Sequence, residues 1–115
     1  VSIGEDNLIV GVDFSRANPA SVSSVLAIKK ETQEIAWKYA VDSRINSQIT
    51  LDSEENAYFS TQAGNVYSLN KDGQLNWKMN FPFTIFTSPV IHENALYIAL
   101  ANSVIVKITV PIFLE

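Results

Sequence analysis

Apolar and polar residues alternate along this chain in runs of four to six, and helical periodicity is nearly absent. Alternation with many β-branched and aromatic residues is typical of strands. Short polar stretches with glycine, "QAGN" at 62–65 and "KDG" at 71–73, separate such runs and are typical of hairpin turns. The pattern predicts ten strands, at 7–12, 24–29, 35–39, 47–51, 56–61, 66–70, 75–79, 87–91, 95–100 and 103–108.

The chain also repeats itself with a period of about 40 residues. "EIAWK" at 34–38 returns as "QLNWK" at 74–78, so that Trp37 and Trp77 lie 40 positions apart. The flanking runs align as well, with gaps only in the turns. A period of this length marks a repeat architecture. The chain therefore divides into a partial unit (1–40), a full unit (41–80) and a second partial unit (81–115).

Several predicted strands are apolar on both faces. Leu96 and Ile98 point one way while Ala95 and Tyr97 point the other, whereas a strand with one solvated face would alternate to polar. Four-stranded antiparallel units stacked face to face around an axis, as in a β-propeller, cover both faces. We expect an all-β partial propeller of two and a half blades, where a closed ring needs at least about four. The alternative is a two-layer β-sandwich, in which 66–70 and 95–100 would not lie in separate radial sheets.

The repeat motifs resemble the PQQ-like repeat of quinoprotein-type β-propellers, over almost the whole chain. The matching residues are Trp37, Gly73, Trp77, Ser88-Pro89-Val90 and Leu96-Tyr97-Ile98. The chain departs from the family at Lys29 and Asn70, where Asp is usual, and at Gln33, where Gly is usual. The resemblance implies that Trp37 and Trp77 lie on outermost strands and fill the gap between successive blades, with each indole N–H bonded to a backbone acceptor.

Composition excludes several classes of function. The net charge of −4 without a basic stretch argues against a nucleic acid partner. With no cysteine, the chain has no disulfide, thiolate metal site or covalent haem attachment. No apolar run approaches the roughly 20 residues of a transmembrane segment. Because the chain starts without Met and ends in Leu114-Glu115, a common cloning junction, we expect a fragment of a longer propeller; the alternative is self-association through open blades.

Candidate chemistry is sparse. His92, the only histidine, falls in a predicted hairpin turn and is expected to be solvated, with a catalytic or metal-binding role as the alternative. The acidic run Asp52, Glu54 and Glu55 lacks the ligand spacing and central glycine of a calcium loop, so we expect a solvated turn. We assign no catalytic, cofactor-binding or metal-binding residue.

The most unusual stretch is "FPFTIFTSP" at 81–89. Its aromatic residues Phe81, Phe83 and Phe86 either bury their rings between two blades or form an exposed patch for a partner chain. They are the candidate partner-binding residues of the sequence.

Two functions follow. The first is a non-catalytic scaffold or protein-recognition module, part of a larger extracytoplasmic PQQ-like protein of the cell envelope or surface, which binds a protein partner and needs no cofactor. The alternative is a fragment of a PQQ-dependent quinoprotein dehydrogenase, which would use PQQ and calcium. The adjacent-cysteine disulfide that the resemblance would then imply is absent from these residues.

Overall fold

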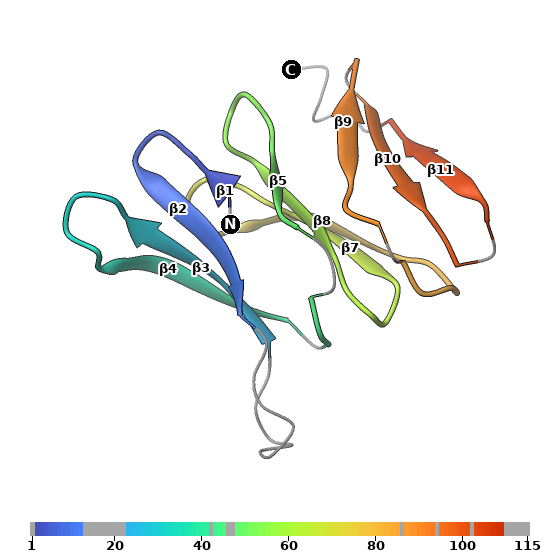
Figure 1. Ribbon diagram of the computed structural model, residues 1–115, viewed down its shortest axis with the longest axis horizontal. Helices are drawn as coiled ribbons and strands as arrows, with labels where there is room; N and C mark the ends of the chain where they lie inside the picture. Colours follow the sequence, from blue (N-terminus) through green and yellow to red (C-terminus); the bar gives the residue numbers. More distant parts are fainter. Residues whose placement is uncertain are drawn as a thin grey trace.

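The computed structural model describes residues 2–12, 23–41, 43–45, 48–85, 87–93, 95–101 and 103–109. These ranges contain eleven strands and no helix. The strands form three antiparallel sheets that follow one another along the chain, side by side in a fan (Figure 1). Within each sheet, strands that are consecutive in sequence are neighbours, so every sheet is a simple meander.

The first sheet is made of β1 (Ser2–Ile3), β2 (Asn7–Val12), β3 (Ser23–Lys29) and β4 (Ile35–Val41). The second sheet is made of β5 (Thr50–Leu51), β6 (Ala57–Ser60), β7 (Asn65–Leu69) and β8 (Leu75–Asn80). In the described residues the third sheet has three strands, β9 (Val90–His92), β10 (Ala95–Ala99) and β11 (Ile105–Ile108). The edge strand β11 therefore takes the place that β3 and β7 hold inside their sheets.

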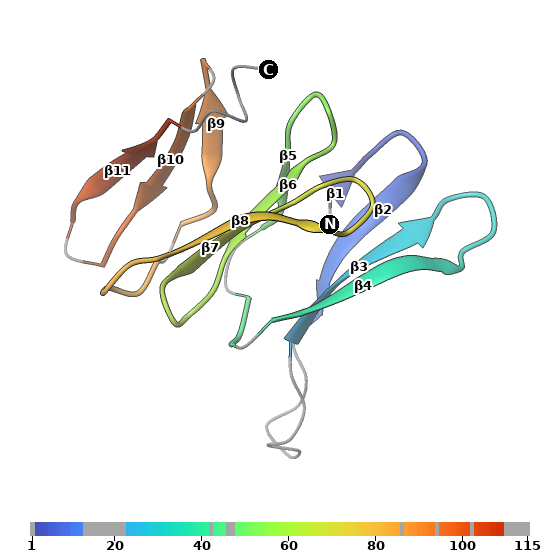
Figure 2. The same ribbon diagram turned by 180° about the vertical axis from the view of Figure 1, so that it is seen from behind.

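Each of the ten predicted ranges overlaps an observed strand. The prediction missed β1, because a strand of two residues shows no alternation; it pairs with β2 through Ser2↔Ile9 and Ile3↔Leu8. Strands β7 and β10 lie in separate sheets, and both views show three sheets side by side rather than two layers (Figures 1 and 2). This arrangement excludes the two-layer sandwich.

Two apolar layers separate the three sheets. The first layer lies between the first and second sheets, and its members include Val25, Ala27, Val41, Phe59, Tyr67 and Leu69. The second layer lies between the second and third sheets, and its members include Tyr58, Val66, Leu96, Ile98 and Ile108.

The middle sheet explains why the sequence is apolar on both faces. Every residue of β6 and β7 is buried. Neighbours on these strands point to opposite faces, so Tyr58 belongs to the second layer and Phe59 to the first. The ring of Phe59 also stacks on that of Tyr67 across the strand pair, with centroids 5.1 Å apart. The middle sheet thus contributes one face to each of the two layers.

Candidate functional site

Trp37 joins the first sheet to the second. Its ring, on β4, packs against the first apolar layer, and its Nε1–H donates to the carbonyl oxygen of Lys71 in the β7–β8 turn, at 2.9 Å. In the same turn Gly73 has φ 82°. A Cβ at Gly73 would lie 2.5 Å from Cδ2 of Trp37, so the indole rests on a backbone that only glycine can offer.

Trp77 has the equivalent position on β8. It is opposite Ser68, as Trp37 is opposite Ala27. Its ring packs against the second apolar layer, with its centroid 6.0 Å from that of Tyr58. The Nε1 atom is buried, yet it has no hydrogen-bond partner among the described residues. The two tryptophans therefore share a position but differ in how their polar atom is satisfied.

The predicted aromatic stretch connects the second sheet to the third. Phe81 is half-buried, packs against the second apolar layer, and donates its backbone N–H to the carbonyl oxygen of Gly64 at 2.8 Å. Phe83 remains 42% exposed, and Phe86 lies outside the described residues. A Cβ at Gly64 would lie 2.7 Å from the carbonyl oxygen of Phe83. The structure thus places the ring of Phe81 against the second apolar layer and that of Phe83 at the surface, which separates two of the three residues that the sequence grouped.

A polar groove, here called the rim groove, runs across hairpin turns of the first and second sheets. It consists of three adjoining hollows of about 540, 260 and 620 Å³. The first two share Glu55, Lys71 and Asp72, and the last two share residues 5–7. The turns belong to one end of the fan, where the β1–β2, β3–β4 and β5–β6 hairpins point the same way (Figure 1).

Asp52 organises the β5–β6 turn that forms one wall of this groove. One carboxylate oxygen accepts the N–H groups of Glu54 and Asn56, each at 2.9 Å. The other accepts the side-chain amide of Asn56 at 3.0 Å and the hydroxyl of Tyr58 at 2.9 Å. The expected solvated turn is wrong for Asp52, because its carboxylate is engaged by the turn and the following strand; Glu54 is exposed as expected.

Tyr58 is held in its neutral form by this environment. Burial of the ring, followed by the hydrogen bond to Asp52 and its negative charge, raises the pKa of the phenol well above its usual value. Removing the proton would place a second negative charge beside a carboxylate in a partly desolvated site. Tyr58 therefore acts as a permanent donor that fixes the turn to the second apolar layer.

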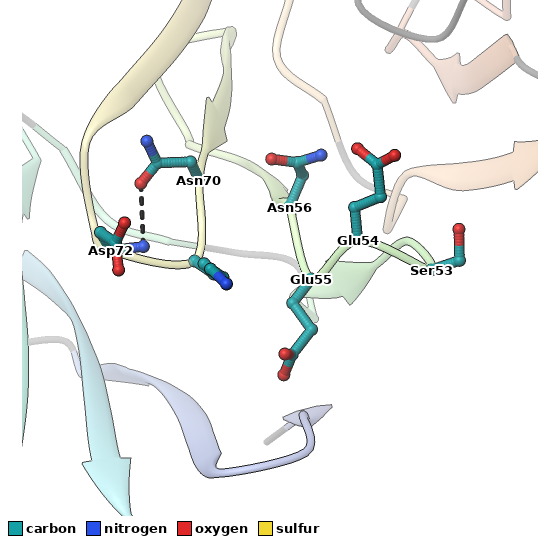
Figure 3. A pocket seen from close by; sticks show the side chains of 7 residues that line it. Ser53, Glu54, Glu55, Asn56, Asn70 and Asp72 are labelled. Carbon is teal, nitrogen blue, oxygen red and sulfur yellow. Dashed lines mark hydrogen bonds between the residues drawn. The ribbon is translucent and has the colours of Figure 1, made fainter. Parts of the chain in front are cut away.

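Glu55 links this turn to the first sheet. Its Oε1 accepts the backbone N–H of Glu5 at 2.7 Å, and Figure 3 shows Glu55 pointing toward the β1–β2 hairpin while Glu54 points away. The facing residue is Gly4, where a Cβ would overlap the Glu55 carboxylate. Glu55 itself has φ 63°, a conformation that costs a non-glycine residue about 1 kcal/mol.

The opposite wall is the β7–β8 turn, which Asn70 closes. Its Oδ1 accepts the N–H of Asp72 at 2.9 Å (Figure 3). The same atom accepts the N–H of Gln74 at 2.9 Å. Its Nδ2 donates to the side chain of Gln74 at 3.1 Å. An asparagine thus supports the turn where the resembled family usually has Asp. In both walls the side chains of Asp52, Asn56 and Asn70 form hydrogen bonds within the turns. By contrast, Glu54, Lys71 and Asp72 are exposed at the surface.

Several acidic side chains line the rim groove, among them Glu5, Glu55 and Asp72. Among the described residues, no group of three His, Cys, Asp or Glu side chains is arranged to hold a metal ion. His92 lies on β9, exposed, with its Nε2 3.7 Å from an oxygen of Glu93. The rim groove offers charge and hydrogen bonding over an open, mostly polar surface.

Comparison with known proteins finds similar structures but no similar sequence family. No family model and no curated protein matches this chain. BamB from Moraxella catarrhalis is similar with a TM-score of 0.66 and 14% identity, over 90% of this chain and 35% of that one. A europium-containing methanol dehydrogenase is similar with a TM-score of 0.70 and 15% identity, over 86% of this chain and 19% of that one. Both are β-propellers. This chain is a partial β-propeller.

A third similar structure, of BBS1N in complex with ARL6DN, has a TM-score of 0.52 and 11% identity, over 89% of this chain and 33% of that one. The chain thus spans about a third of the length of two of these proteins and about a fifth of the other. No helix in the described part of the chain is long and apolar enough to cross a membrane.

Sequence reasoning missed the contacts that build the rim groove. The signal for Asp52 was present, because "DSEEN" has the composition of a turn in which Asp bonds to the backbone ahead of it. No local signal marks the bond from Glu5 to Glu55, since it spans 50 positions. Nor does any local signal pair Lys71 with Trp37.

Proposed function

We propose that this chain is part of a non-catalytic propeller scaffold that recognises another protein through the rim groove. We place the parent protein outside the cytoplasm, in the periplasm, envelope or cell surface, on the resemblance of its repeats. One observation carries the proposal: the residues of the groove fall into two sets. The side-chain amides and Asp52 form hydrogen bonds within the turns, whereas Glu54, Lys71 and Asp72 are exposed at the surface.

The character of the groove favours a protein over a small molecule. Sites for small molecules are mostly apolar and enclosed. The lining of the first hollow is entirely polar or charged, and that of the second departs from this only at Ile9. Exposed charges of both signs give a protein interface its specificity and speed of association. The structural similarity to BBS1N, solved in complex with ARL6DN, supports the same kind of role.

A matched pair of charge reversals tests the groove. Glu54→Lys changes an exposed acid in the groove, and Glu93→Lys changes an exposed acid in the corresponding turn of the third sheet. A photo-crosslinking residue in place of Asp72 in the intact parent protein would identify the partner. We expect Glu54→Lys to weaken binding to that partner about fivefold or more, and Glu93→Lys to leave it unchanged. Equal effects of both variants would reject the groove as the binding surface.

The alternative is a fragment of a PQQ-dependent dehydrogenase, which the similarity to the europium-containing methanol dehydrogenase keeps in view. A shared fold does not carry an activity. Among the described residues no group of three His, Cys, Asp or Glu side chains is arranged to hold a metal ion, and the carboxylate of Asp52 is engaged by a turn. We expect no saturable change in absorbance when the intact parent protein is titrated with PQQ and calcium or europium. Quinone binding with dye-linked alcohol oxidation would overturn the non-catalytic proposal.

A further inference from the structure

Negative charge is concentrated along the rim groove. Six acidic residues and three lysines line its three hollows, so half of the twelve acidic residues of the chain lie there. The imbalance is greatest in the first two hollows, where five of the acids accompany one lysine, Lys71. The six acids are Glu5, Asp6, Glu31, Glu54, Glu55 and Asp72.

The chain itself leaves these charges largely uncompensated. In the part of the chain that the structure describes, none of the six carboxylates forms an ion pair with a lysine or arginine. Lys30 is close by, but its Nζ donates to the backbone carbonyl oxygen of Glu5 at 3.0 Å. Only Glu55 accepts a hydrogen bond from another described residue, the backbone N–H of Glu5. The other five carboxylates are therefore available to a partner.

The turns that carry the acids are held in place before any partner binds. Glu5 belongs to the β1–β2 turn, Glu55 to the β5–β6 turn and Asp72 to the β7–β8 turn. Figure 3 shows Glu55 and Asp72 on turns at either side of the first hollow. Side-chain hydrogen bonds of Asp52 and Asn70 close two of these turns. A groove lined by one sign of charge on fixed turns attracts the opposite charge and loses little entropy on binding.

The spacing of the carboxylates favours a guanidinium over a metal ion. Calcium needs oxygen ligands that converge at about 2.3–2.6 Å from one point, and no three acidic or histidine side chains among the described residues are arranged in that way. A guanidinium carries five N–H donors in a planar fork at the end of a long side chain, so it binds carboxylates that do not converge.

We propose that the protein partner presents an extended, arginine-rich segment to the rim groove, with its arginines in the first two hollows. This inference rests on the proposed recognition function and names the chemistry of its partner. Lys71 lines both hollows. Its carbonyl is held by the indole of Trp37 at 2.9 Å, while its side chain is exposed. An arriving guanidinium competes with the Lys71 ammonium for the same carboxylates, so Lys71 limits the affinity.

A labelled peptide, GRGRGRGRG, is the probe, because it spans about 30 Å when extended and carries arginine at every second position. Fluorescence anisotropy with the intact protein measures its binding. We expect saturable binding that weakens as salt is raised. The lysine counterpart GKGKGKGKG should bind about threefold more weakly, because an ammonium lacks the planar fork. The acidic counterpart GEGEGEGEG should not bind.

Three neutralising variants locate the binding. Glu54→Gln removes an acid of the first hollow and should weaken binding of the arginine peptide about threefold. Lys71→Gln removes the competing cation of the same hollow and should strengthen it by a similar factor. Glu93→Gln removes the same charge as Glu54→Gln from an exposed residue outside the groove and should leave binding unchanged.

Three results would overturn the inference. They are absence of arginine-peptide binding, equal effects of Glu54→Gln and Glu93→Gln, which would mean attraction to net charge alone, and weaker binding after Lys71→Gln. The partner identified by crosslinking separates this inference from the proposed function. If Glu54→Lys weakens that partner but the arginine peptide does not displace it, the groove stands as the binding surface and the arginine-rich segment is wrong. A partner insensitive to Glu54→Lys would reject the proposed function itself.

Discussion

Gly73→Ala should break the contact between the first and second sheets. A Cβ at this position would lie 2.5, 2.6 and 2.8 Å from three carbon atoms of the Trp37 ring, where ordinary contacts are about 3.5–4.0 Å. The indole must therefore move by about 1 Å, which also stretches its 2.9 Å hydrogen bond to the carbonyl of Lys71. The backbone cannot relieve the overlap cheaply, because φ is already 82°.

The magnitude is the sum of three effects. Overpacking costs about 1–3 kcal/mol, a left-handed conformation at alanine about 1–2 kcal/mol, and the weakened hydrogen bond about 1 kcal/mol. We expect Gly73→Ala to lower the free energy of unfolding by about 3–6 kcal/mol, a large part of the stability of an ordinary domain. Urea unfolding followed by circular dichroism measures this loss.

Gln33 provides the matched control. It occupies the corresponding turn of the first sheet with φ 63°, already carries a Cβ, and is exposed. Gln33→Ala should change stability by no more than about 0.5 kcal/mol, and Gln33→Gly should increase it by about 1 kcal/mol by relieving the left-handed strain. In a Trp37→Ala background, the cost of Gly73→Ala should fall to its conformational part. Equal costs at the two turns, or an undiminished cost without the indole, would refute the reasoning.

Three further results are expected from urea unfolding. Trp37→Phe should cost about 1 kcal/mol more than Trp77→Phe, because only the first removes a made hydrogen bond; equal costs would contradict the difference in their partners. Asp52→Ala should cost about 2–4 kcal/mol by removing the carboxylate that accepts from the Tyr58 hydroxyl and the Asn56 groups, and a loss below about 0.5 kcal/mol would show that the turn holds without it. Because the folded pKa of Tyr58 is raised, its contribution is complete below the ordinary tyrosine pKa of about 10 and is lost as pH rises above it; Tyr58→Phe should reduce this alkaline loss, and an unchanged pH profile would contradict it.

The strands were predictable because each leaves a local mark. Alternation and turn residues fall within a few positions of one another. Because the chain repeats, the strand pattern of one unit also supports the pattern predicted for the next. The two-sided burial of β6 and β7 was also foreseeable, since adjacent residues such as Tyr58 and Phe59 are both large and apolar. Only β1 was missed, because pairing rather than composition makes Ser2–Ile3 a strand.

The rim groove could not be predicted in the same way. Its decisive contacts join residues far apart in sequence, as Glu5 meets Glu55 and Trp37 meets Lys71. Even the role of Asp52 within its own turn depends on the next strand, β6, which brings the hydroxyl of Tyr58 to its carboxylate. Charge counts could place acids in a turn, but only the geometry shows which of them are engaged by the backbone.

The packing contact between Trp37 and Gly73 is formed by two different repeat units. The indole comes from one 40-residue unit, and the glycine that admits it comes from the next. A duplicated unit therefore fits between its neighbours without strain only if it meets two conditions. Its glycine must accept the tryptophan of the unit before it, and its tryptophan must pack on the glycine of the unit after it. Selection on such a protein would act on the junctions between units as much as on the units, so that residues 36 positions apart change together while neighbours in the same hairpin vary independently.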